Sequence, residues 1–439
     1  MELAAVEGFV ESLGDTVLDW SYKGFGSLPA PVTVAEVRHR GQGPQALGLH
    51  ELGTPMMTVD LSAVADNLLQ MSSWCGEHGV QLAPHGKTTM APLLWLGQLM
   101  SGCVGITVAN ASQLRAARAF GVDHLQLASE LVQPADVAWV AAELERHEDF
   151  EFICWVDSVE AVERMQTALV GQPGRARVPV CVEVGAAAGR TGARGLDAVL
   201  AVAAAVNAAD RLALAGVSGY EGAVPGASPD AAGLAAVDAF LRAMADAHLA
   251  LTDLYETARV TVTAGGSSFF DRVAAVLGPL AAPEAARPVD VVLRSGAYVV
   301  HDDVHYRDRT PSSRGDGPPL RAAIHVWAGV LSRPEPDLVI LDAGRRDLPF
   351  DLDLPVVLSA SRSGSPRVDV PVGRATVVRL NDQHAFVRVG GDCELAVGDV
   401  VRLGLSHPCT AFDKWRAIAL LDSADVLEPR VEDVVLTFF

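Results

Sequence analysis

Residues 178–217 read VPVCVEVGAAAGRTGARGLDAVLAVAAAVNAADRLALAGV and show the pattern that organises most of the chain. Residues 178–184 and 212–217 are apolar runs of ordinary strand length, and the Ala-rich segment between them has room for a helix. Six further runs follow the same alternation, at residues 80–83, 104–108, 125–128, 152–156, 260–263 and 289–293. Eight strands separated by helices predict a closed (β/α)8 barrel, and an open doubly wound sheet fits the same pattern.

The pattern changes at both ends of this region. Residues 56–59 are expected to be an extended lead-in, and Asp60 is expected to cap the helix that follows. Residues 307–319 (RDRTPSSRGDGPP) are typical of a linker or an exposed loop. Strand-like runs then follow at 324–331, 338–341, 375–380, 385–389, 400–403 and 417–421. We therefore predict a barrel over residues 51–310, a C-terminal β-domain over 311–439, and an N-terminal segment, 1–50, that joins the β-domain.

Composition excludes several classes of protein. The chain has 439 residues, of which 50% are apolar, and its formal charge of −20 argues against binding to nucleic acid or to an anionic membrane surface. No apolar stretch reaches the ~20 residues that a membrane-spanning helix needs. The N-terminus lacks the basic region of a secretory signal, and the six cysteines show no paired spacing. We therefore expect a cytoplasmic protein with reduced thiols.

Lysine is rare, and one lysine lies at a chemically informative place. Only three of the 34 basic residues are lysines, namely Lys23, Lys87 and Lys414. In a barrel, reactive groups lie just past the carboxyl ends of the strands, and Lys87 follows the first predicted strand together with His85. An amine there can form a Schiff base if its pKa is depressed, although a solvated loop lysine is the alternative interpretation.

Other strand ends carry groups suited to an anionic, planar ligand. An arginine there suits a fixed anion or phenolate, a tyrosine can stack on a ring or donate a proton, and small residues that enter a helix can bind a phosphate through backbone N–H groups. Each also has a plainer interpretation as a surface arginine, a rim aromatic or a simple turn. The candidates are Arg190, Tyr220, Gly265, Gly266, Ser267, and the segment from Arg294 to Tyr298.

The β-domain contributes a candidate metal pair. In an extended segment, residues i and i+2 point to the same side, so His407 and Cys409 could bind one metal together. A thiolate and an imidazole suit zinc, and two protein ligands leave positions for water or substrate. A buried cysteine beside a hydrogen-bonded histidine is the alternative.

Together these residues resemble the fold-type III enzymes that use pyridoxal phosphate (PLP), the alanine racemase-like group, over about residues 50–425. The similarity is greatest to the D-serine dehydratase and D-threonine aldolase branch. The resemblance implies that Lys87, in the motif Pro84-His85-Gly86-Lys87-Thr88, binds the cofactor covalently, and that Arg190 contacts the ring hydroxyl. It further implies that Tyr220 faces the ring and that Gly265, Gly266 and Ser267 cradle the phosphate. Arg294 and Tyr298 are implied to lie near the ring nitrogen. His407 and Cys409 are implied to hold the metal. Thr89-Met90 departs from the His-Lys that commonly follows the lysine motif, and Arg294 is not typical of every member of the branch.

The expected activity is therefore that of a PLP- and zinc-dependent D-amino acid deaminase. Such an enzyme converts a small D-β-hydroxy amino acid to a 2-oxo acid and ammonia by β-elimination. A metal-activated D-threonine aldolase would use the same residues to give glycine and an aldehyde. A racemase, a non-catalytic PLP carrier and a Schiff-base barrel aldolase without PLP are further alternatives. The resemblance also implies a homodimer.

Overall fold

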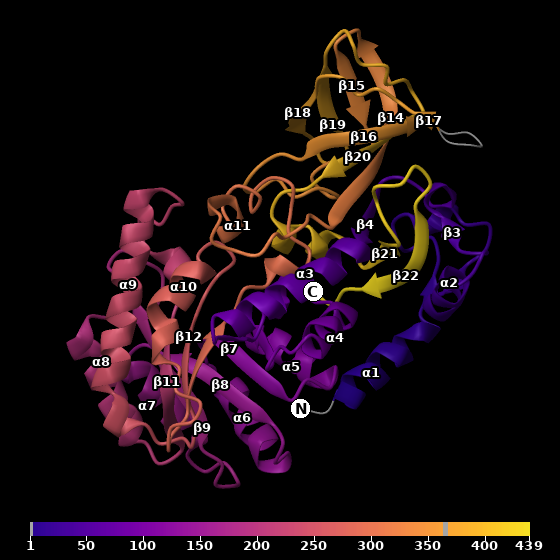
Figure 1. Ribbon diagram of the computed structural model, residues 1–439. Helices are drawn as coiled ribbons and strands as arrows, with labels where there is room; N and C mark the ends of the chain where they lie inside the picture. Colours follow the sequence, from indigo (N-terminus) through magenta and orange to yellow (C-terminus); the bar gives the residue numbers. More distant parts are fainter. Residues whose placement is uncertain (1–2, 363–367) are drawn as a thin grey trace.

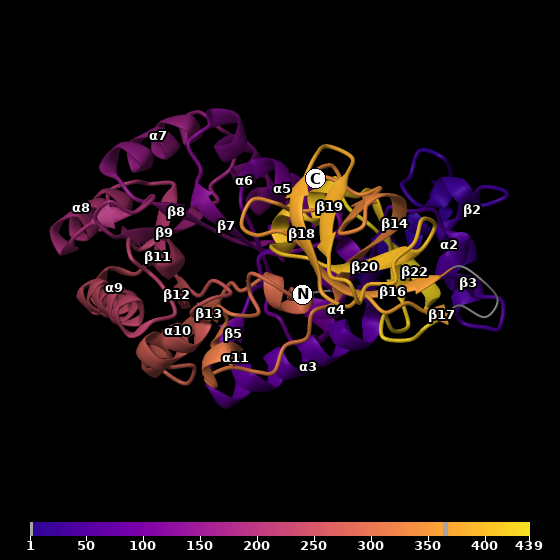
Figure 2. The ribbon, with the colours of Figure 1, turned by 90° about the horizontal axis from the view of Figure 1, so that it is seen from above.

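The computed structural model describes residues 3–362 and 368–439, which form a barrel and a β-rich second domain beside it (Figure 1). In Figure 1 the barrel occupies the lower left, and the second domain, mainly orange and yellow, rises at the upper right. The view from above shows the barrel helices on the outside and the second domain at one side of the barrel (Figure 2).

Eight parallel strands form the barrel wall, and each contains residues of one of the predicted apolar runs. In spatial order they are β5 (Gln81–Leu82), β13 (Val289–Leu293), β12 (Val260–Ala264), β11 (Leu212–Gly219), β9 (Val178–Gly185), β8 (Glu151–Val156), β7 (His124–Glu130) and β6 (Ile106–Val108). The first and last strands meet, because a parallel bridge joins His85 to Thr107 and the Val104 N–H donates to the Leu82 carbonyl at 2.9 Å. The ring is therefore closed, which confirms the barrel over the open sheet.

Helices surround this ring and begin at recognisable residues. Asp60 caps the first of them, as expected, by accepting a hydrogen bond from the Ala63 N–H at 3.0 Å. Asn110, Ser158 and Asp230 cap later helices in the same way. The helices are α3 (Leu61–Glu77), α4 (Pro92–Met100), α5 (Ala111–Ala119), α6 (Pro134–Arg146), α7 (Val159–Leu169), α8 (Leu196–Asn207), α9 (Ala231–Ala250) and α10 (Phe270–Leu277).

The alternation of side chains along the strands separates the inside of the barrel from its outer core. Val180 and Val182 of β9 belong to the large core that includes helix residues, whereas Cys181 packs with Trp155 in a small cluster of its own. Because successive strand residues point to opposite faces, Glu183 shares the face of Cys181. The barrel interior therefore becomes polar towards its carboxyl end.

The second domain is built on a mixed sheet, which takes in residues that were predicted to begin the barrel. Its main path contains β17 (Val368–Asp369), β16 (Val356–Arg362), β20 (Val400–Gly404), β14 (Ile324–Glu335), β4 (Met56–Asp60), β21 (Ala417–Leu421), β22 (Arg430–Leu436) and β3 (Leu47–Gly48). Strands β15 (Leu338–Leu341), β19 (Ala385–Val389) and β18 (Ala375–Leu380) extend from β14. The expected lead-in at 56–59 is thus a strand between β14 and β21, and the barrel begins at Leu61.

The N-terminal segment divides between the two parts. Helix α1 (Leu3–Ser12) packs on the barrel, where the ring of Phe9 lies 4.6 Å from that of Phe120. The residues after α1 contribute Leu18 and Phe25 to a core shared with Trp327 of the second domain. The short elements of this segment and of two loops are β1 (Val17–Leu18), β2 (Val32–Thr33), α2 (Val34–Gly41), β10 (Ala193–Arg194) and α11 (Pro311–Arg314). The prediction that residues 1–50 join the β-domain therefore does not hold for α1.

All six cysteines are free thiols, and five of them are buried. In the described part of the chain, no helix combines the length and the apolar character needed to cross a bilayer.

Candidate active site

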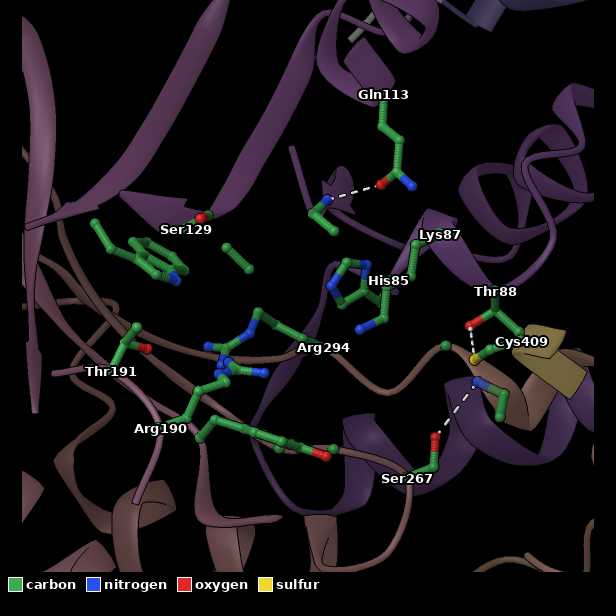
Figure 3. Close-up of a pocket in the computed structure, with 18 of the residues that line it drawn as sticks. His85, Lys87, Thr88, Gln113, Ser129, Arg190, Thr191, Ser267, Arg294 and Cys409 are labelled. Atoms are coloured by element: carbon green, nitrogen blue, oxygen red, sulfur yellow. Dashed lines mark hydrogen bonds between the residues drawn. The ribbon is translucent and has the colours of Figure 1, made fainter. Parts of the chain in front are cut away.

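A cavity of about 720 Å³ opens at the carboxyl ends of the barrel strands and is also lined by the second domain (Figure 3). Except for Tyr298, the predicted site residues all line it: His85, Lys87, Arg190, Tyr220, Gly265, Gly266, Ser267, Arg294, His407 and Cys409. Residues more than 300 positions apart in the sequence therefore meet in one chamber.

Lys87 lies in a short turn, Gly86–Thr88, immediately after the first barrel strand. Burial lowers the pKa of the Lys87 amine, and the positive charges of Arg190 and Arg294 act in the same direction against the opposing charge of Cys409. The turn requires glycine at position 86, because a Cβ there would lie 2.7 Å from the Trp95 ring. A lowered pKa increases the share of neutral, nucleophilic amine.

His85 lies half-buried beside this lysine, with its Nδ1 atom buried. Burial, followed by the charges of Lys87 and Arg294, holds the pKa of His85 far below its usual range. Its Nδ1 has no hydrogen-bond partner among the residues that the structure describes. The side chain is therefore a neutral imidazole with a polar atom left for a ligand.

Two arginines extend towards the same part of the cavity (Figure 3). Arg294 follows β13 and is held in place by two hydrogen bonds that it donates. Its Nη1 donates to Thr263 Oγ1 at 2.7 Å and its Nη2 to the Gly219 carbonyl at 2.6 Å. The guanidinium carbon of Arg190 lies 5.2 Å from the centre of the Tyr220 ring. No carboxylate in residues 3–362 or 368–439 forms an ion pair with either arginine. With Lys87 nearby, this wall of the cavity suits an anionic ligand.

The glycine turn after β12 differs from the predicted phosphate cradle. The N–H groups of Gly265 and Gly266 donate to the buried carboxylate of Glu221, at 3.0 and 2.7 Å. They are therefore engaged within the protein, because a fully buried carboxylate needs donors and the two amides supply them. Ser267 remains at the cavity, and its Oγ accepts from the Ala297 N–H at 3.3 Å.

Tyr298 is not at the site, which corrects the prediction. It is 2% exposed, and its hydroxyl lies 3.8 Å from the Cys103 sulfur. The residue sits in a turn, Ala297–Val299, that directs the ring towards α3 and away from the cavity. Tyr306 lines the cavity instead, beside Ser267. Sequence reasoning missed Tyr306 because it lies in the irregular stretch after the last barrel strand.

His407 and Cys409 come together through a tight turn and not through the extended segment that was predicted. His407 has a left-handed backbone with φ of 41°, and Pro408–Thr410 form a turn of 3-10 helix. The Nδ1 atom of His407 lies 2.5 Å from Asp351, so the ring donates to a carboxylate and leaves Nε2 for a metal. The Cys409 sulfur lies 3.5 Å from the Thr88 hydroxyl. The second domain thereby brings both candidate ligands next to the lysine turn.

The electrostatics of this pair favour a thiolate next to an imidazolium. Burial alone would raise the pKa of Cys409, but hydrogen bonds from His407 and Thr88 and the positive charges of His407 and Lys87 lower it. Against the effect of burial, Cys409 and Asp351 raise the pKa of His407 to about 9. A thiolate and an imidazole that is oriented by a carboxylate are a donor set that fits zinc.

Glu130 and Glu183 also line the cavity, and sequence reasoning missed their contribution. Burial, together with a hydrogen bond and the charge of Glu183, raises the pKa of Glu130 to about 8. Glu183 lies within the predicted strand 178–184 and Glu130 lies two residues past the predicted strand 125–128, so their places at strand ends were the available signal.

Comparison with known proteins agrees with this arrangement. Residues 323–421 match the family described as "Putative serine dehydratase domain", and this part contains His407 and Cys409. A D-threonine aldolase from Arthrobacter sp is 29% identical over 378 residues, which cover 83% of this chain and 88% of that protein.

Solved structures show the same fold. The D-threonine aldolase from Filomicrobium marinum superposes with a TM-score of 0.73 at 23% identity, covering 89% of this chain and 97% of that one. The D-threo-3-hydroxyaspartate dehydratase from Delftia sp. HT23 gives a TM-score of 0.67 at 20% identity, with coverage of 88% and 98%. Alanine racemase from Bacillus anthracis is more distant, with a TM-score of 0.56, 14% identity and coverage of 87% and 97%.

The chain therefore has the alanine racemase-like, type III fold: a (β/α)8 barrel with a second β-domain. Within that fold, the resemblance to the D-serine dehydratase and D-threonine aldolase branch is confirmed by the matched domain and by the Arthrobacter relative.

Proposed function

We propose that this protein is a PLP- and zinc-dependent lyase that acts on a D-amino acid with a β-hydroxyl group. The main support is the convergence of Lys87, the two cavity arginines and the His407–Cys409 pair in one chamber. The names of the relatives, an aldolase and a dehydratase of hydroxylated D-amino acids, support the same class of reaction.

The residues at the cavity fit the cofactor. Lys87 would hold its aldehyde carbon, Arg190 and Arg294 would contact polar atoms of the ring, and Ser267 and Tyr306 would contact the phosphate. When bound, PLP supplies a conjugated ring that takes up the charge left at the substrate α-carbon. Because the pKa of Lys87 is lowered, its Nζ atom can accept the α-proton once the amine is free.

The His407–Cys409 pair would serve the second part of the reaction, at the β-carbon of the substrate. His407 Nε2 and Cys409 Sγ would hold zinc, and a bound zinc ion polarises the β-hydroxyl of the substrate. Asp351 keeps the His407 ring oriented through Nδ1. The lysine turn and the metal pair touch through Thr88, so proton removal at the α-carbon and activation at the β-carbon can occur on one substrate.

We further propose that the reaction is β-elimination to a 2-oxo acid and ammonia. The matched serine dehydratase domain supports this outcome. Retro-aldol cleavage is the second candidate, and the identity to the Arthrobacter aldolase favours it.

Product analysis separates these reactions. Purified protein loaded with PLP and zinc is incubated with D-serine and with D-threonine, and L-serine serves as a control. Pyruvate and ammonia from D-serine support elimination, whereas glycine and acetaldehyde from D-threonine support the aldolase. We expect Cys409→Ala or a chelator to abolish turnover while the cofactor absorbance remains. Full activity after exhaustive chelation would refute the metal role.

A further inference from the structure

Three carboxylates lie together at the ends of neighbouring barrel strands. Glu130 ends β7, Asp157 directly follows β8, and Glu183 lies near the end of β9. Each offers an oxygen atom, and these atoms all lie within 4.8 Å of one another. The strands β7, β8 and β9 are neighbours in the ring, so the cluster is a feature of the barrel wall and not of a mobile surface.

The cluster contains buried oxygen atoms without partners. Glu183 is 4% exposed, and its Oε2 has no hydrogen-bond partner among the described residues. The buried Oε1 of Glu130 has none either, although a hydrogen bond links the carboxyl groups of Glu130 and Glu183. Ser218 of β11 lies beside Glu183 of β9 in the register of the sheet and is fully buried. Its hydroxyl also has no hydrogen-bond partner within the described chain. Buried polar atoms normally have a partner, so these oxygen atoms indicate a place for a ligand that oxygen atoms can bind.

The charge of Arg294 interacts with Glu183, but no basic side chain of the described residues forms an ion pair with the cluster. Within residues 3–362 and 368–439, no lysine, arginine or histidine nitrogen forms an ion pair with any of the three carboxylates. Arg294 is directed to Thr263 and Gly219. One oxygen of Asp157 accepts the Gly192 N–H at 3.2 Å, which holds the side chain in place without changing its charge.

Three close carboxylates in a partly buried wall require either protons or a cation. A set of carboxylate oxygens with an adjacent hydroxyl suits a hard divalent cation such as Mg²⁺ or Mn²⁺. The thiolate and imidazole of His407 and Cys409 instead suit a soft metal. The two donor sets therefore differ in chemistry as well as in their place in the fold.

We propose that Glu130, Asp157 and Glu183 bind one hard divalent cation, separate from the His407–Cys409 site. Such an ion would join the ends of β7, β8 and β9 and would neutralise the acidic side of the substrate cavity. The proposal does not depend on which lyase reaction the protein catalyses, because binding requires no substrate.

Manganese binding tests the site. The PLP-loaded protein is first given one equivalent of zinc per chain and is then titrated with Mn²⁺, while the signal of free Mn²⁺ is followed by electron paramagnetic resonance. We expect one Mn²⁺ per chain, and a dissociation constant at least about tenfold higher in both Glu183→Gln and Asp157→Asn, since each removes one charged ligand.

A matched control separates this site from general attraction to an acidic protein. Glu335→Gln removes one carboxylate from an exposed ion pair of the second domain and should bind Mn²⁺ as the unchanged protein does. Circular dichroism checks that each variant is folded, and Asp157→Asn, at the less buried position, keeps the test informative if Glu183→Gln unfolds. Absence of a bound equivalent, or equal affinity in all variants, would overturn the proposal and leave the carboxyl groups sharing protons.

Discussion

Glu221 illustrates how a single buried carboxylate shapes the cavity without facing a ligand. It is fully buried and accepts the N–H groups of Gly265 and Gly266. The turn that it holds approaches Tyr220 closely, because a Cβ on Gly266 would lie 2.7 Å from the tyrosine ring. The glutamate therefore fixes the position of the wall that carries Ser267.

The change Glu221→Gln should lower stability and weaken cofactor binding together. A glutamine has only one acceptor oxygen, so one backbone N–H loses its partner at a cost of about 1–3 kcal/mol. Urea unfolding and PLP titration measure the two effects, and the exposed Glu148→Gln serves as the control. Unchanged stability and unchanged PLP affinity would show that the carboxylate does not hold the turn.

The candidate residues also show what sequence can predict at single positions. Lys87, Arg190 and Arg294 were found because each follows a predicted strand, and the barrel places such positions in one chamber. The prediction that Tyr298 lies at the site was wrong because the local turn, which no periodicity reveals, directs its ring to α3. Asp351 was missed because its role depends on a contact between segments 56 residues apart.

At the level of secondary structure, the turn that holds His407 and Cys409 is stabilised by a residue that lies outside the turn. His407 has a left-handed backbone, and Asp351 accepts hydrogen bonds from both His407 Nδ1 and the Thr410 hydroxyl. A conformation of this kind persists only when its surroundings fix it. The carboxylate thus holds the turn and orients the imidazole at the same time.

The change Asp351→Asn should reduce zinc affinity by about 10–100-fold while the cofactor absorbance stays unchanged. Competition with a chromophoric chelator measures the affinity. Asp353→Asn is the matched control, because the Asp353 carboxylate lies near His305 and, in the described structure, forms no hydrogen bond or ion pair with His407. Equal losses in the two variants would contradict the role given to Asp351.

Across the full chain, the periodic part was predictable and the connections between distant segments were not. Eight apolar runs with helices between them sufficed for the barrel, because a parallel barrel buries each strand on both faces. The placement of β4 between β14 and β21 was not predictable, since it pairs residues about 270 and 360 positions apart. The same long-range pairing brings the metal turn of the second domain to the barrel mouth.

In the proposed function, the Lys87 amine carries the cofactor inside the barrel mouth. The chain offers a direct test because it contains only three lysines, of which Lys23 pairs with Asp347 and Lys414 approaches Asp413. PLP-loaded protein is reduced with borohydride and mapped by peptide mass spectrometry. We expect one adduct, on Lys87, and none in Lys87→Ala. Protein without an adduct, or with the adduct on Lys23 or Lys414, would contradict it.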